Sequence, residues 1–206
     1  MPKGALLARP AGSRRQNDVL MQPQLRRIVD ELNHAQSRLD RLADDVAEDR
    51  WGKRSDPSRW SVGECVAHLN LTGAAYVPRI RKAIEEARRL PKTGTRSYKR
   101  DPVGWLFGTM VGPLPMIGKM RIGRVKTTPA FVPSGDMPKQ QQLAEFKRLQ
   151  IELVSLAGES DGLPIDKVSI TSPFGEKIHY NCYSAFVLLP RHEERHIQQA
   201  ELVWSR

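Results

Sequence analysis

The sequence contains few aromatic residues, few cysteines and no long apolar run. Aromatic residues make up 6% of the 206 residues, and the only cysteines are Cys65 and Cys182. Two cysteines are too few for a disulfide framework, which argues against a small, disulfide-stapled secreted protein. The nearest candidate for a membrane span, residues 103–118, is shorter than about 18 residues and is interrupted by glycines and prolines, so it predicts no transmembrane helix. A hydrophobic content of 39% is enough for an ordinary globular core.

The first 17 residues are basic and contain neither aspartate nor glutamate. They lack the apolar run that a signal peptide needs. We interpret residues 1–22 as a disordered or loosely ordered tail and residues 23–206 as one domain. Because neither a signal peptide nor a membrane span is indicated, we expect the protein to be cytoplasmic.

The net charge of +10 is concentrated in one segment. Residues 77–126 contain 13 lysines and arginines against three acidic residues, whereas the rest of the chain contains 20 of each sign. A basic segment raises the question of nucleic-acid binding. Few aromatic side chains that could stack on bases accompany it, and no recognised binding motif does, so we disfavour a nucleic-acid partner. The segment is then either a solvated face or a surface that attracts an anionic small molecule.

Four segments have the apolar periodicity of amphipathic helices, at about residues 24–47, 61–90, 138–157 and 181–204. Pro78 and Pro190 lie inside two of them and should bend them. A link of 47 residues, 91–137, joins the second helix to the third, and a short hairpin is expected around residues 173–175. This pattern predicts an all-α fold, most simply a four-helix bundle with one long crossover between helices two and three.

The start of the second helix has a clear sequence signature. Ser61 and Glu64 form the pattern of a capping box, in which each side chain accepts a hydrogen bond from the backbone N–H of the other residue. Trp60 and Cys65 flank this box at the positions of a hydrophobic staple. Glu64 is also a candidate general base, but the capping role explains it, and we favour that role.

Three of the five histidines are placed so that they could share a metal ion. His192 and His196 are four residues apart, so on a helix they lie on one face, one turn from each other. Alone, this spacing is also common for two solvated histidines. His68 has apolar neighbours on the second helix, where a lone histidine is usually a hydrogen-bonded core residue. In a helical bundle, however, such a histidine can complete a site begun by a pair on another helix. Three neutral imidazoles bind zinc, nickel, iron or manganese and leave positions open for water or substrate.

Other polar residues have weaker claims to a role in this site. Cys65 and His68 share a helix face, so a mixed cysteine–histidine ligand set stays open. Glu193 and Glu194 point about 100° and 200° away from His192 on the same helix. We interpret them as solvated or as supporting the ligands from behind.

The remaining candidates are Gln199, which either orients a bound water or faces a neighbouring helix, and two histidines that we expect at the surface, His34 and His179. We also expect the crossover link to form part of the wall of the site, because its apolar side chains need somewhere to pack: Trp105, Leu106, Phe107, Met110, Met116 and Met120.

Two blocks of the sequence resemble the DinB-like superfamily, with the likeness extending over about residues 24–203. The blocks are Trp60-Ser61-x-x-Glu64-x-x-x-His68-Leu69 and Arg191-His192-x-x-Arg195-His196-x-x-Gln199. The resemblance implies a four-helix bundle of the up-down-down-up type. It also implies one divalent metal ion, held by His68 of the second helix and by His192 and His196 of the fourth.

Known activities in that superfamily include metal-dependent thiol transferases that use low-molecular-weight thiols, as well as isomerases and hydrolases. From the resemblance we expect a metal-dependent hydrolase or thiol transferase that acts on a small molecule, either an anion or a low-molecular-weight thiol. Zinc or nickel is the first choice of metal, with iron or manganese as alternatives. A non-catalytic metal-binding or dimeric scaffold is the alternative reading, and a homodimer is expected because exposed faces of such bundles often pair.

Overall fold

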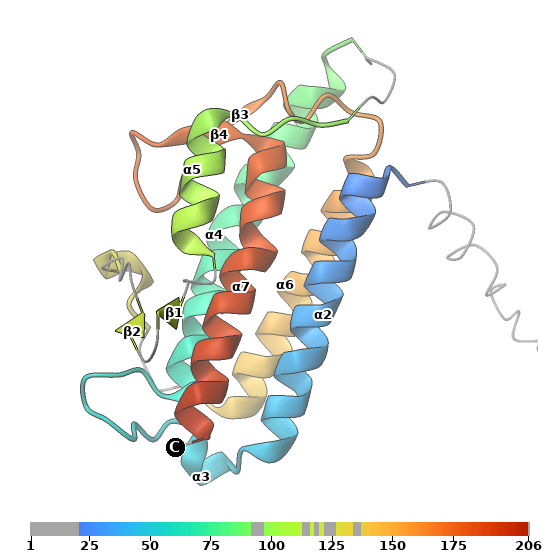
Figure 1. The fold of residues 1–206 in the computed structure, drawn as a ribbon. Coiled ribbons are helices and arrows are strands. Elements are labelled where there is room, and N and C mark those ends of the chain that lie inside the picture. Colours follow the sequence, from blue (N-terminus) through green and yellow to red (C-terminus); the bar gives the residue numbers. More distant parts are fainter. Residues whose placement is uncertain are drawn as a thin grey trace, which may run out of the picture.

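A computed structural model describes residues 21–91, 97–112, 116–117, 120–121, 127–133 and 137–205 (Figure 1). Most of them are helical, which confirms the all-α class. The long helices are α2 (Pro23–Asp45), α4 (Val62–Arg88), α6 (Lys139–Glu159) and α7 (Cys182–Trp204). The shorter ones are α3 (Glu48–Trp51), α5 (Pro102–Val111) and the 3-10 turn η1 (Pro129–Phe131). The strands form two antiparallel pairs, β1 (Met116–Ile117) with β2 (Met120–Arg121) and β3 (Ser169–Thr171) with β4 (His179–Asn181).

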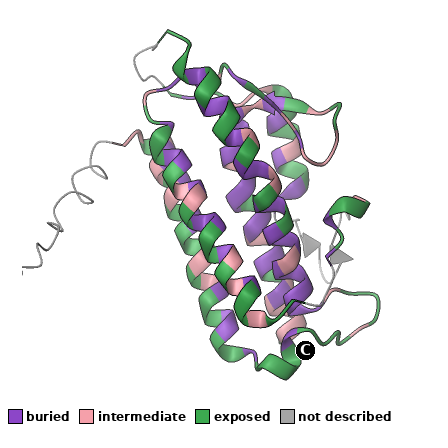
Figure 2. Ribbon diagram, turned by 180° about the vertical axis from the view of Figure 1, so that it is seen from behind, coloured by how far each residue is buried: buried purple, intermediate pink, exposed green. Residues whose placement is uncertain are grey.

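The four long helices lie side by side (Figure 1). Both α2 and α4 pack against α6 and α7. The helices α2 and α7 begin at the end of the molecule that carries β3 and β4, whereas α4 and α6 begin at the opposite end, near α3. Buried residues line the inner faces of these helices (Figure 2), as their amphipathic patterns require. Residues 1–20 of the predicted tail lie outside the described residues.

The helix starts that the sequence predicts are present. The backbone N–H of Glu64 donates to Ser61 Oγ at 3.1 Å, and the N–H of Ser61 donates to Glu64 Oε2 at 2.8 Å, so the capping box is formed. At the start of α7, the N–H of Ser184 donates to Asn181 Oδ1 at 2.8 Å. The predicted hairpin is the β3–β4 pair. Both α4 and α7 continue past their internal prolines.

The link between α4 and α6 contains a helix, α5, that the sequence pattern does not predict. Asp101 caps this helix by accepting from the N–H of Gly104 at 2.9 Å, and its second oxygen accepts from the N–H of Asn181 at 2.8 Å. Gly104 allows α5 to approach α7 closely, because a Cβ at this position would overlap the side chain of Ser184. Tertiary contacts therefore stabilise a segment whose glycines disfavour a helix.

The expectation that the apolar side chains of this link pack inward is partly wrong. Trp105, Leu106 and Met110 are exposed, at 54%, 56% and 45%, because they lie on the face of α5 that points away from α7. Phe107 instead packs against the core. The side chains of Met116 and Met120 lie outside the described residues. None of the described helices is long and apolar enough to cross a membrane.

Candidate metal centre

The three histidines predicted from the sequence meet in the structure. His68 extends from α4, and His192 and His196 extend from α7, one turn apart. Each offers one ring nitrogen such that these atoms all lie within 4.8 Å of one another. The Nε2 atoms of His68 and His192 are 3.1 Å apart. All three side chains are buried, with exposed fractions of 3%, 5% and 7% in chain order.

The hydrogen bond made by His68 fixes which of its nitrogens can bind a metal ion. Its Nδ1 lies 2.8 Å from the backbone carbonyl oxygen of Phe131. Because a carbonyl can only accept a hydrogen bond, Nδ1 carries the proton and Nε2 presents its lone pair. That lone pair points toward His192. Metal-ligating histidines in proteins are oriented by the same kind of bond to a carbonyl.

Burial keeps the three rings neutral. Burial is the main reason why the pKa of His192 is lowered to about 3, and the charges of His68 and Arg195 contribute to the same shift. Burial is also the main reason why the pKa of His68 is lowered and the pKa of His196 lies well below its usual value. Neutral imidazole is the form that coordinates a metal ion, so this part of the fold prepares the ligand state at neutral pH.

Two buried ring nitrogens have no hydrogen-bond partner within the described part of the chain, namely Nδ1 of His192 and Nδ1 of His196. The carbonyl of Val111 and the side chain of Gln199 lie close enough to oppose the lowering of the pKa values of His192 and His196, without reaching standard hydrogen-bond geometry. Burying polar atoms without partners costs free energy. Three neutral imidazoles whose ring nitrogens converge are a donor set that suits zinc, nickel, iron and manganese.

Aromatic side chains enclose the histidines. The Trp60 ring stacks on His196 at 5.9 Å between centroids and lies 5.0 Å from His68. Phe174, in the turn between β3 and β4, lies 5.9 Å from His192 and 4.6 Å from Phe131. Sequence reasoning gave Trp60 only a stapling role and missed the two phenylalanines. The one signal in the sequence that could have indicated these phenylalanines is that each lies in a proline-containing turn.

The alternative roles considered for Glu64 and Cys65 do not fit the structure. Glu64 accepts from Ser61 and also forms a two-pronged ion pair with Arg54, which is the main reason why its pKa is lowered. Both of its oxygens are therefore engaged by Arg54 and Ser61, which supports the capping role. Cys65 is buried and is not part of the ligand group that the described residues bring together.

Of the two roles considered for Glu193, the solvated one does not fit the structure. Its exposed fraction is 4%, because this side of α7 is covered by the other long helices. Burial raises the pKa of Glu193 to about 8, and a hydrogen bond from the side chain of Gln150 on α6 opposes the shift. Glu194 lies closer to solvent and pairs with Arg38 of α2. His34 and His179 are exposed, as predicted, although His179 lies in strand β4.

The structure is therefore that of a mostly helical protein with a candidate metal centre. In this centre, two helices bring three neutral imidazoles together. The sequence model of the DinB superfamily matches residues 31–200, a range that includes all three histidines. The chain belongs to the DinB superfamily. Searches of the curated proteins and of the solved structures gave no match.

Proposed function

We propose that this protein is a metal-dependent enzyme whose His68, His192 and His196 hold one divalent ion. Zinc or nickel is the first choice, and iron or manganese the alternative. The observation that carries the proposal is the convergence of three buried, neutral imidazoles in a member of the DinB superfamily. The order and directions of the four long helices support an up-down-down-up bundle as its scaffold.

A divalent ion at this position would act as a Lewis acid that activates a water molecule or a thiol. The chain itself supplies the surroundings. The carbonyl of Phe131 holds the His68 ring in its orientation, and the rings of Trp60, Phe131 and Phe174 pack around the imidazoles. This arrangement supports hydrolysis or thiol transfer as the reaction class.

The proposed substrate is an anionic small molecule or a low-molecular-weight thiol that reacts as a thiolate. Arg195 supports this choice, because its positive charge lowers the pKa of all three histidines and therefore acts at the site. The same charge would attract an anion. Nη1 of Arg195 donates to the carbonyl of Met110 at 2.9 Å, which holds the guanidinium group beside the end of α5.

The test is turnover of a panel of thiols with electrophiles, and of esters and amides, by the metal-loaded protein. We expect activity that disappears on chelation and in a His196→Ala variant but persists in a His34→Ala variant, in which an exposed histidine is removed. Turnover that is equal in the chelated and metal-loaded protein would contradict the proposal. Stoichiometric metal binding without any turnover would favour a scaffold.

The second candidate, a dimeric scaffold, is favoured by one observation. The outer face of α5 exposes Trp105, Leu106 and Met110, an apolar surface that a second copy could cover. Light scattering on the wild type and on a Trp105→Ser, Leu106→Ser variant tests this candidate. A dimer that becomes a monomer in the variant supports it, and a monomeric wild type contradicts it.

The nucleic-acid alternative receives little support. Several basic side chains of residues 77–126 are already paired with acidic ones, including Arg81 with Glu152 and Arg88 with Glu159. Such pairs reduce the positive charge that this side of α4 offers to phosphates.

A further inference from the structure

A second feature of the molecule concentrates positive charge away from the histidines. A surface groove of about 360 Å³ lies between the start of α2, the segment before α5 and the first half of α7. Three arginines line it, one from each of these parts of the chain: Arg27, Arg100 and Arg191. Glu31 is the one acidic residue among its lining residues, so three positive charges face a single negative charge.

These arginines lack the acidic partners that several other arginines of the described residues have. Arg38, Arg54 and Arg148, for example, each pair with at least one glutamate. Among the described residues, no carboxylate lies within 4 Å of a guanidinium nitrogen of Arg27, Arg100 or Arg191. A group of unpaired guanidinium groups repels itself, and that cost falls when an anion enters.

Arg100 gives the groove a polar atom that requires an acceptor. Its Nη1 is buried, and no described residue accepts a hydrogen bond from it. This nitrogen lies beside Gly108 of α5, where a Cβ would be 3.7 Å away. A buried N–H of a charged group is costly without an acceptor, and the oxygen atom of a ligand in the groove would supply one.

The segment that carries Arg100 is held in place by Gln24. The N–H of Tyr98 donates to Gln24 Oε1 at 2.7 Å, and Gln24 Nε2 donates to the carbonyl of Tyr98 at 3.0 Å. The same nitrogen lies 3.0 Å from the hydroxyl of Tyr183, which it also donates to. These bonds tie the segment to α2 and α7. The groove is therefore preorganised, which reduces the entropy that a ligand would have to offset on binding.

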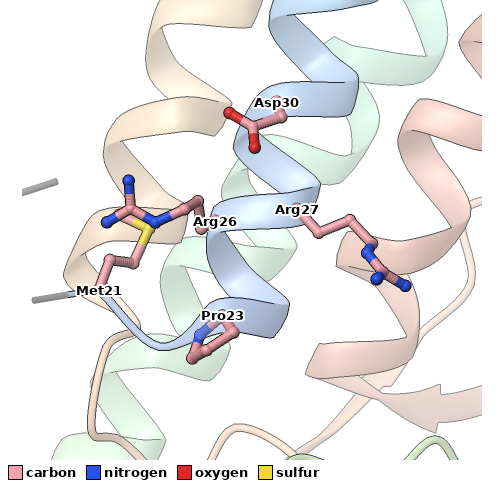
Figure 3. Close-up of a pocket in the computed structure, with 5 residues that line it drawn as sticks. All are labelled: Met21, Pro23, Arg26, Arg27 and Asp30. Carbon is pink, nitrogen blue, oxygen red and sulfur yellow. The ribbon is translucent and has the colours of Figure 1, made fainter. Parts of the chain in front are cut away.

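A neighbouring hollow shares Arg27 with the groove and also contains Arg26, which the groove does not. Figure 3 draws this hollow, of about 410 Å³, with the side chains of Met21, Pro23, Arg26, Arg27 and Asp30. In this view Arg27 extends toward α7 and the groove, whereas Arg26 lies on the opposite side of α2, beside Met21. Arg26 is thus a basic residue of the same helical turn that does not line the groove.

The groove and the histidines use different faces of α7. Tyr183, Val187 and Arg191 recur every four residues and face the groove. His192 follows Arg191, about 100° further around the helix. Neither this groove nor the hollow of Figure 3 is lined by any of the three histidines.

We propose that Arg27, Arg100 and Arg191 form a binding site for the phosphate or carboxylate group of a soluble ligand, separate from the candidate metal centre. The planar guanidinium fork matches both groups and can bind each with two hydrogen bonds. The ligand enters the open side of the groove, and its oxygen atoms accept from Arg100 Nη1 at the base and from the two exposed arginines at the rim.

Isothermal titration calorimetry with pyrophosphate and with citrate, at constant ionic strength, tests the site. The protein is first dialysed free of metal, because both probes also bind metal ions. We expect saturable binding of at least one probe with a stoichiometry of one. The probe that binds more tightly assigns the group as phosphate or carboxylate.

The variants decide whether binding occurs in the groove. Arg100→Gln and Arg191→Gln each remove one charge-assisted hydrogen bond and should weaken binding about tenfold or more. Arg26→Gln, the matched control, should leave it within about twofold. Arg27→Gln provides a further groove variant at an exposed position if Arg100→Gln does not fold.

The absence of saturable binding in the wild type would overturn the proposal. Anion binding that is weakened equally by Arg26→Gln and by the groove variants would also overturn it, because that result indicates general attraction by the basic surface. The metal content of the groove variants is measured in parallel. Because the histidines are intact in them, loss of anion binding with normal metal content separates this site from the proposed metal centre.

Discussion

The hydrogen bond from His68 Nδ1 to the carbonyl of Phe131 ties a candidate ligand on α4 to the link that precedes α6. It fixes the tautomer of the ring and the direction of the Nε2 lone pair. The Phe131 side chain packs against Phe174, which in turn lies beside His192. The orientation of the ligands therefore depends on residues far from them in sequence.

Phe131→Ala should weaken zinc binding by about tenfold. The substitution keeps the backbone carbonyl but removes the packing that holds it against His68, and the loss of such supporting contacts typically costs 10- to 100-fold in metal affinity, as an order of magnitude. Competition with a chromophoric chelator measures the affinity. Phe131→Leu, which retains most of the packing volume, should bind zinc nearly as tightly as the wild type. Unchanged affinity in Phe131→Ala would contradict the role assigned to this contact.

Glu193→Gln should stabilise the protein relative to the wild type, and this stabilisation should be larger at about pH 8 than at about pH 5. Burial raises the pKa of Glu193 from 4.5 to about 8, so the folded chain keeps a proton that the unfolded chain releases between these values. The free energy of unfolding of the wild type therefore loses a contribution as the pH rises through that window. Glutamine cannot titrate, so its advantage over glutamate should grow from near pH 5 to near pH 8. Urea denaturation of both metal-free proteins measures it, and an advantage that does not change with pH would refute this account.

At the scale of elements, α3 and α4 meet at a contact that needs glycine. A Cβ on Gly63 would lie 2.7 Å from Cδ1 of Trp51, whose Nε1 donates to Gln142 Oε1 at 3.0 Å in the interior. The Trp51 ring cannot move aside without breaking that buried bond. Close packing of α3 on α4 thus depends on the absence of a side chain at position 63.

Gly63→Ala should destabilise the fold by about 1–3 kcal/mol, the usual cost of overpacking, although alanine is the better helix former. Gly52→Ala is the matched control, because a Cβ at that position meets nothing within 4 Å. Chemical denaturation of the two variants should show a lower unfolding midpoint for Gly63→Ala alone. Equal midpoints would show that Trp51 adapts without cost.

The elements also show what the sequence can and cannot predict. Helix starts with local caps, Ser61 and Asn181, were predictable because their hydrogen bonds connect residues three apart. The helix α5 was not, since it depends on Asp101 bonding to Asn181, 80 residues away. The three histidines were identified from spacing and family resemblance. Their aromatic enclosure by Phe131 and Phe174 arises from tertiary contacts that no local pattern records.

At the scale of the whole molecule, the candidate metal centre joins two helices that are far apart in the chain. His68 and His192 are separated by 124 positions, and their Nε2 atoms lie 3.1 Å apart only when α4 packs on α7. An ion held there binds the folded chain in preference to the unfolded one, so it stabilises the fold in proportion to its affinity. Metal binding at this site would therefore be coupled to folding.

The metal content of the purified protein tests this account most directly. Elemental analysis after removal of loosely bound ions should find one zinc, nickel, iron or manganese ion per chain in the wild type and in His34→Ala, and less than about a tenth of that in His196→Ala. Circular dichroism confirms that the variant is folded. Equal metal content in all three proteins would contradict the assignment of His68, His192 and His196 as a metal site.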